Sequence, residues 1–269
     1  MDFALSERAA DFRADVKAFL AEQVTDEVVG AMHESGTFND RGLNGALADA
    51  GLLAGAVPGY GNRDPVELYI LFNELEKVGA PYDGLAVTML VAGVVHSVGT
   101  DFHRTEVLEK LITGRHNCCL GYSEPDHGSD VAAITTRAVR DGDGWVIDGR
   151  KMWTTMAHES DWVLLLTRTN ADVEKHRGLT MFLVPMDTPG VNIERMLTVF
   201  GYDDAPHGHA EVEFADVRVP ASNILLGEGR GFEIAQGRLG PGRIHHCMRC
   251  IGVAERALEA MCQRAKARV

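Results

Sequence analysis

Length, composition and charge restrict the classes of protein to which this chain can belong. It has 269 residues, of which 45% are hydrophobic and 24% charged, enough for one large or two to three small domains with apolar cores. Lys and Arg number 26 against 39 Asp and Glu, so the net charge is −13. Such an acidic chain is a poor candidate for a general nucleic-acid binder, which needs clustered cations for phosphate contacts.

The cysteines and the apolar runs indicate where in the cell the protein is expected. The chain has five cysteines, an odd number without framework spacing, which is typical of reduced thiols in a cytoplasmic protein. These are Cys118, Cys119, Cys247, Cys250 and Cys262. No basic segment followed by an apolar core opens the sequence, and no run of about 18 apolar residues occurs. We therefore expect neither a secretory signal nor a membrane span.

The first 116 residues have the apolar spacing of helices. Phe12, Val16, Phe19 and Leu20 form one apolar stripe, with Ser6 as a candidate N-cap. The predicted helices cover residues 6–24, 40–50, 64–79, 83–98 and 102–112, the third of them opened by Asp64 and Pro65. We expect an N-terminal helical domain over residues 1–116.

The pattern changes after Asn117 to short β-like runs separated by turns. These runs cover residues 118–122, 135–140, 145–147, 162–169, 181–185, 191–195, 210–214 and 217–219. The Asp-Gly-Asp-Gly sequence at 141–144 predicts a hairpin turn. About eight strands suffice for a small antiparallel barrel or sandwich, so we expect a middle β domain over residues 117–228.

Helical spacing returns after the glycine-rich segment 227–231. It covers residues 232–239 and 244–267, and Gly240, Pro241 and Gly242 predict an interruption between them. The sequence reaches Val269 without a capping residue, so we expect residues 229–269 to be the beginning of a truncated C-terminal helical domain. The predicted fold class is a multidomain α+β protein.

The segment 120–155 carries most of the functional information. It reads LGYSEPDHGSDVAAITTRAVRDGDGWVIDGRKMWTT and sets small hydroxylated residues, predicted in loops, beside one large aromatic residue. This combination suits a flat heteroaromatic ligand better than a metal or a phosphate. Taken singly, Ser129 and Asp130 could be a plain turn and Trp153 a core residue. As an ordered set, they resemble the flavin-binding signature of acyl-CoA dehydrogenases.

The resemblance implies FAD as the cofactor and an acyl-CoA thioester as the substrate. Residues matching Tyr122 and Ser123 offer backbone and hydroxyl hydrogen bonds to the flavin; Trp153 matches an aromatic that packs on its ring, and Thr155 a hydroxyl near its reactive N5. The residue matching Ser129 meets the thioester or pantetheine region. The implied cofactor-binding set is Tyr122, Ser123, Gly128, Trp153, Thr154 and Thr155. The resemblance further implies an electron-transfer flavoprotein as acceptor and a homodimer or homotetramer.

A second block, residues 229–249, resembles a subgroup of the family in which some members act on 4-hydroxyacyl-CoA. The resemblance implies substrate contacts from Gly240, Pro241, Gly242 and Arg243, with Arg243 the best anchor for an anionic or carbonyl-rich group. The acyl chain is expected near residues 90–98 and 239–243.

The family reaction also needs a carboxylate base to remove the α-proton of the thioester. Some members carry it on this helix, where the matching position here is Gly242, so we expect the base beyond Val269 and name no catalytic residue. We therefore expect this chain to bind flavin weakly and to catalyse poorly. The alternative is a non-catalytic fragment or an accessory subunit of a heteromeric acyl-CoA dehydrogenase, and an oxidase remains open.

Four residues offer a zinc interpretation. Cys247 and Cys250 have the spacing of a zinc knuckle and follow His245 and His246. On a continuous helix, however, residues three apart share a face to which the adjacent histidine pair does not belong. No second Cys/His pair lies at the usual distance, so we predict no metal site.

Overall fold

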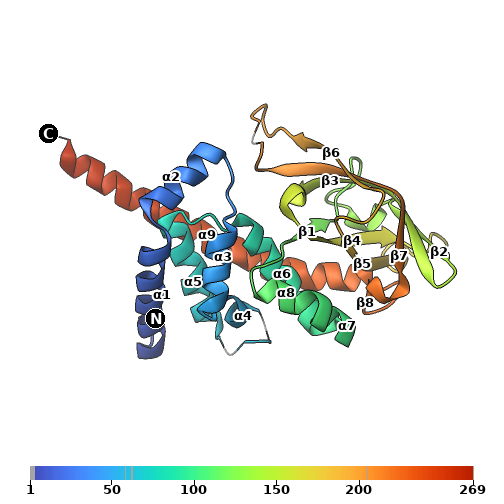
Figure 1. Cartoon of the computed structure of the whole chain (residues 1–269), viewed down its shortest axis with the longest axis horizontal. Helices are drawn as coiled ribbons and strands as arrows, with labels where there is room; N and C mark the ends of the chain where they lie inside the picture. Colours follow the sequence, from blue (N-terminus) through green and yellow to red (C-terminus); the bar gives the residue numbers. More distant parts are fainter. Residues whose placement is uncertain (1–3, 58, 62, 204, 269) are drawn as a thin grey trace.

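The computed structural model describes residues 4–57, 59–61, 63–203 and 205–268. Figure 1 shows helices in one half of the molecule, a sheet in the other, and one long helix, α9, that runs through both. The predicted order of helical, β and helical regions is therefore confirmed. The domain boundaries at 116 and 228 stay a prediction, and Val269 lies outside the described residues.

The N-terminal half is helical, as expected. Its helices are α1 (Glu7–Gln23), α2 (Asp26–Ser35), α3 (Arg41–Asp49), α4 (Leu52–Ala56), α5 (Pro65–Val78), α6 (Asp83–Val98), α7 (Asp101–His103) and α8 (Glu109–Ile112), with a π-helical turn η1 (Arg104–Leu108) between the last two. The sequence prediction missed α2 and α4, which are short. The helix predicted over residues 83–98 is α6, and half of its residues are buried, among them Leu85, Val91 and Val95.

Local capping explains where several of these helices begin and end. Ser6 Oγ accepts a hydrogen bond from the Ala9 N–H at 3.3 Å. The Asp64 carboxylate accepts from the N–H groups of Val66 and Glu67 at 2.8 and 2.9 Å, with proline at the first helical position. Gly79 ends α5 with a φ of 68°, which a residue with a Cβ adopts only at a cost. These boundaries confirm the sequence prediction.

The β region is one mixed sheet rather than the predicted antiparallel barrel or sandwich. Its strands are β1 (Cys118–Gly121), β2 (Arg137–Asp141), β3 (Gly144–Thr155), β4 (Trp162–Arg168), β5 (Leu179–Pro185), β6 (Val191–Leu197), β7 (His209–Pro220) and β8 (Ile224–Leu225). The strand order is β6-β7-β3-β2-β4-β5-β8, with β1 beside β4, and over the described residues the sheet does not close. β1 and β2 both pair with β4 in parallel. These strands are distant in sequence, so no hairpin turn sets their relative direction, and the sequence pattern could not reveal it.

Two strands are longer than predicted. β3 continues to Thr155 instead of ending at residue 147, and β7 joins the two separate runs predicted at 210–214 and 217–219. Both strands contain bulges, at which the register between them shifts. Gly149, with a φ of 153°, lies at one bulge and packs against Thr136, where a Cβ would come within 2.6 Å of the Thr136 Cα. The segment around Trp153 therefore belongs to a strand, not to the predicted loop.

The C-terminal helix α9 (Gly231–Ala267) is continuous, so the predicted interruption at Gly240-Pro241-Gly242 is wrong. An internal proline removes one helical hydrogen bond and costs about 3 kcal/mol. Tertiary packing offsets this cost, because α9 lies against α5, α6 and β5 along most of its length (Figure 1). A Cβ at Gly252 would come within 2.6 Å of the Asn73 carbonyl oxygen of α5, which shows how closely the helices approach.

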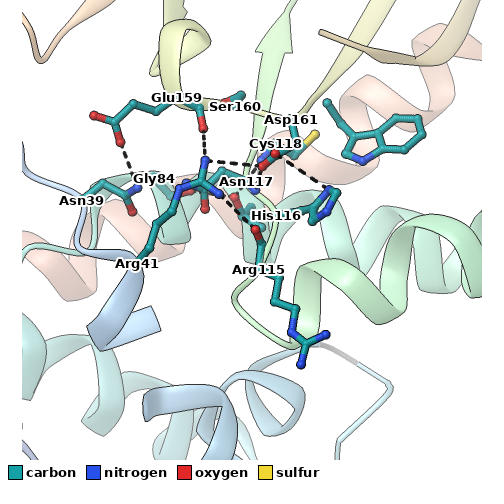
Figure 2. Close-up of polar contacts among 12 residues, drawn as sticks. Asn39, Arg41, Gly84, Arg115, His116, Asn117, Cys118, Glu159, Ser160 and Asp161 are labelled. Carbon is teal, nitrogen blue, oxygen red and sulfur yellow. Dashed lines mark hydrogen bonds and ion pairs between the residues drawn. The ribbon is translucent and has the colours of Figure 1, made fainter. Parts of the chain in front are cut away.

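A polar junction joins the helical half to the sheet. Figure 2 shows the Arg41 guanidinium between two backbone carbonyl oxygens, those of Arg115 at 3.0 Å and Glu159 at 2.9 Å. Asn39 Nδ2 donates to the Glu159 carboxylate at 3.0 Å, and Asp161 accepts from the Asn117 N–H at 2.8 Å. Arg41 therefore fixes α3 to the segments that precede β1 and follow β3, the two strands that carry the signature residues.

Candidate functional site

The signature loop leaves the sheet at the end of β1 and is hydrogen-bonded to β3. Glu124 and His127 exchange two backbone hydrogen bonds, of 2.8 and 3.1 Å, which close a tight turn. The Ser123 carbonyl oxygen accepts from the Met152 N–H at 2.9 Å. The two halves of the predicted signature, around Tyr122 and around Trp153, are therefore side by side although they are about thirty residues apart.

A buried ion pair strengthens this connection. Lys151 Nζ donates to Glu124 Oε1 at 2.9 Å and to the Tyr122 carbonyl oxygen at 3.1 Å, and both charged side chains are at most 4% exposed. The other Glu124 oxygen accepts from the N–H and hydroxyl of Thr135 at 2.7 and 2.8 Å. Glu124 thus holds β3, the signature loop and the approach to β2 together.

The environment of this pair changes both pKa values. Burial by itself would raise the pKa of Glu124, but Lys151 and the hydrogen bonds from Thr135 and Thr136 outweigh it and lower that pKa to about 2. Burial lowers the pKa of Lys151 to about 8, against the opposing effect of Glu124. Both groups are therefore charged at neutral pH. Our sequence prediction missed the pair, because its two members are 27 positions apart and no local pattern connects them.

Trp153 has an unusual backbone conformation next to this pair. Its φ is 61°, in the left-handed region that costs a residue with a Cβ about 1 kcal/mol or more, and its indole is 48% exposed. It lies at the bulge between Lys151 and Thr154, where the register with β7 shifts. Strain of this kind concentrates at functional sites, and here it presents a flat apolar surface beside the signature loop.

His209 contacts the end of the same strand. Its Nδ1 lies 2.9 Å from Thr155 Oγ1, and its ring meets that of Trp153 edge-on with centroids 6.0 Å apart. Thr154, between these two, is buried. No role for His207 or His209 was predictable from the sequence pattern. In the structure His209 orients Thr155, and His207 Nε2 lies 3.5 Å from the Asp83 carboxylate at the start of α6.

Gly128 and Ser129 lie on the exposed part of the loop. A Cβ at Gly128 would meet nothing within 4 Å. Ser129 lines an open cavity of about 280 Å³, together with Val131, Lys175 and Phe232. The structure thus brings Ser129 close to the first turn of α9 and not to Trp153.

A second, more apolar cavity of about 320 Å³ lies between α6, α9 and the end of β8. Its lining includes Leu90, Val94, Val98, Leu226, Ile234, Gly237, Arg238 and Pro241. This is the region in which the acyl chain was expected. Of the four α9 residues among the five predicted to bind substrate, Pro241 alone is part of the lining; Gly240 and Arg243 are exposed, and Gly242 packs against Leu90 and Arg238.

The residues of the zinc interpretation do not converge. His245 is buried and packs edge-on against Phe72, with ring centroids 4.4 Å apart, while Cys247 and Cys250 are exposed. Burial lowers the pKa of His245 to about 3, so it is neutral. Among the residues that the structure describes, no three His, Cys, Asp or Glu side chains lie together in a way that could hold a metal ion.

Comparison with known proteins gives the same family assignment over most of the chain. The acyl-CoA dehydrogenase N-terminal domain matches residues 6–115, the middle domain residues 119–217 and the C-terminal domain residues 229–269. Acyl-CoA dehydrogenase family member 11 of Gallus gallus is 51% identical over 180 residues, which are 65% of this chain and 23% of that relative. The chain thus corresponds to about a quarter of the length of this curated relative.

Solved structures match this chain over a larger share of their own length than the curated relative does. Butyryl-CoA dehydrogenase from Megasphaera elsdenii is 28% identical with a TM-score of 0.85, over 100% of this chain and 71% of that one. The structure described as the electron transferring flavoprotein of Acidaminococcus fermentans is 28% identical with a TM-score of 0.86, also over 100% of this chain and 71% of that one. With three domains of one family matched in order and the fold shared, we conclude that this chain belongs to the acyl-CoA dehydrogenase family of oxidoreductases.

Proposed function

We propose that the protein catalyses FAD-dependent α,β-dehydrogenation of an acyl-CoA thioester. The observation that carries this proposal is the junction of Ser123 and Met152, reinforced by the buried Glu124–Lys151 pair, which brings both halves of the signature to one place. An enzyme that acts on a bound ring and an acyl chain needs rigidly held hydrogen-bonding groups next to an apolar cavity. This arrangement supplies both.

The residues present fit a flavin. Trp153 offers a flat, half-exposed aromatic surface in a strained conformation that a purely structural residue would not need. We assign cofactor contacts to Tyr122, Ser123, Gly128, Trp153, Thr154 and Thr155, with the buried Thr154 acting through its backbone. Bound FAD would supply the acceptor for the hydride. Hydrogen-bond donors such as the Thr155 hydroxyl, which His209 orients, would tune its electron affinity.

We place the acyl chain in the cavity between α6 and α9, with Ser129, Gly240, Pro241, Gly242 and Arg243 on the path of the thioester and CoA. The cavity is largely apolar, which suits an aliphatic chain. Gly242 carries no side chain that could act as a base. We assign the base to no residue of this chain.

The proposed partners follow from the family. We propose an electron-transfer flavoprotein as the electron acceptor and a homodimer or homotetramer as the assembly. The cytoplasm is the proposed location, which the free cysteines suit. Within the described ranges, no helix combines the length and the apolar character needed to cross a bilayer.

The test is the visible absorption spectrum of the purified protein before and after addition of FAD, followed by dehydrogenation of acyl-CoAs with an artificial electron acceptor. A stoichiometric flavin band and turnover support the proposal. A protein that takes up no FAD contradicts it, and it would favour the alternative of an accessory subunit, for which co-purification of a longer homologue is the direct test.

A further inference from the structure

A partly buried arginine in the wall of the α6–α9 cavity has no acidic partner among the described residues. Arg238 lines the cavity among apolar side chains such as Leu90, Val94 and Ile234. Its Nε is buried and makes no hydrogen bond, and within the described part of the chain its guanidinium forms no ion pair. Burial accordingly lowers the pKa of Arg238. A partly buried guanidinium without a partner is destabilising, and a bound anionic group would compensate it.

The neighbours of Arg238 do not supply this compensation. Tyr122, whose phenol Arg238 is near enough to influence electrostatically, is neutral and 9% exposed, and its hydroxyl has no hydrogen-bond partner among the described residues. His245 is neutral. Glu233 also lines the cavity, but its carboxylate is bound by Arg230 at 2.8 and 3.0 Å. The Arg238 Nε in the cavity wall and the nearby Tyr122 hydroxyl are thus two polar groups without a partner among the described residues.

Gly242 packs against the Arg238 side chain. A Cβ at position 242 would lie 3.5 Å from Arg238 Nη1 and 3.9 Å from a methyl carbon of Leu90. These are ordinary contact distances, so the guanidinium of Arg238 lies directly against the backbone at Gly242 on the inner side of α9. Arg238 and Gly242 are one helical turn apart, and together they place a positive charge in the cavity wall.

We propose that Arg238 is a specificity-determining residue that selects acyl chains carrying an anionic oxygen group, of which a carboxylate is the simplest. A buried guanidinium binds such a group through charge-assisted hydrogen bonds, and a plain hydrocarbon chain leaves it unpaired. The proposal rests on the proposed acyl-CoA function and adds the substrate class. It differs from the expectation for Arg243, which is exposed on the same helix and was assigned to the CoA part.

The test compares pairs of CoA thioesters that differ only in a terminal carboxylate: butyryl- with succinyl-CoA, pentanoyl- with glutaryl-CoA, and hexanoyl- with adipoyl-CoA. Binding to the FAD-saturated protein is measured by calorimetry. At least one anionic member is expected to bind about tenfold to a hundredfold more tightly than its neutral partner. In Arg238→Met this preference should disappear, whereas neutral thioesters should bind equally well or better because the unpaired charge is gone.

Two further variants distinguish the roles. Arg243→Met, on the CoA side, should weaken both members of each pair equally. Arg264→Met, near the end of α9 and outside the cavity lining, should change neither. The inference is wrong if the wild-type protein binds neutral acyl-CoAs but prefers no anionic partner. It is also wrong if Arg238→Met weakens the binding of both members of a pair alike, or if it weakens the binding of FAD. If no thioester binds at all, the proposed function fails instead.

Discussion

Replacing Lys151 with methionine tests the strongest structural link in the site. The substitution keeps the length of the side chain but leaves the Glu124 carboxylate buried without its cation. Removing one partner of a buried ion pair costs about 3–5 kcal/mol, and we expect the lower end because Glu124 keeps its hydrogen bonds from Thr135 and Thr136. The lowered pKa of Glu124 gives a similar magnitude for the stabilisation of its charged form, because a carboxyl pKa of about 2 instead of 4.5 corresponds to about 3 kcal/mol.

The assay is urea unfolding followed by circular dichroism, with FAD affinity measured in parallel. Lys175→Met is a matched control, because its ion pair with Asp130 at 2.7 Å is more than half exposed on both sides and should contribute at most about 1 kcal/mol. Lys151→Met should also weaken FAD binding, because Lys151 donates a hydrogen bond to the Tyr122 carbonyl oxygen. The double variant Lys151→Met/Glu124→Gln should regain part of the stability, because it removes the uncompensated charge.

The pH dependence supplies an independent check. Because the pKa of Glu124 is lowered in the folded protein, its contribution to the free energy of unfolding is complete above pH about 4.5 and is lost as the pH falls toward 2. In Lys151→Met the pKa of Glu124 rises toward its unfolded value, so this loss should be smaller and should end at a higher pH. If Lys151→Met costs no more than Lys175→Met, or if the two acid-unfolding profiles have the same shape, the buried pair does not have the role assigned to it.

The other predictions concern the flavin surface and the α9 contact. Trp153→Gly relieves the positive φ but removes the aromatic face, so the unfolding free energy should change by less than about 1 kcal/mol while FAD affinity, measured by flavin fluorescence, falls at least about tenfold. Thr155→Val removes the hydroxyl that contacts His209; we expect about 1 kcal/mol lower stability and weaker FAD binding, and unchanged affinity would argue against this contact. Gly252→Ala should destabilise the protein despite the better helix propensity of alanine, because its Cβ would collide with α5. Gly237→Ala, where a Cβ would meet nothing within 4 Å, should raise the free energy of unfolding by up to about 1 kcal/mol. Equal effects of the two variants in urea unfolding would contradict the packing of α9 on α5.

Sequence alone was sufficient wherever the deciding interactions are local. The helix that begins at Asp64 and Pro65 was predictable because its cap consists of adjacent residues. The strands β1 to β7 were recognisable from their spacing, although β8 was missed, and the segment around Tyr122 and Trp153 identified the family from an ordered motif. Residue type and spacing carry this information without any knowledge of distant contacts.

Tertiary structure decided what depends on contacts between distant residues. The α9 helix continues through Pro241 because packing on α5, α6 and β5 outweighs the local preference for a break. The Glu124–Lys151 pair and the contact of His209 with Thr155 join residues that are 27 and 54 positions apart, so no local pattern announces them. The sequence by itself determined the elements and the family. The direction of the strands, the course of α9 and the unpaired charge of Arg238 emerged only from folding, because each depends on which surfaces are buried against one another.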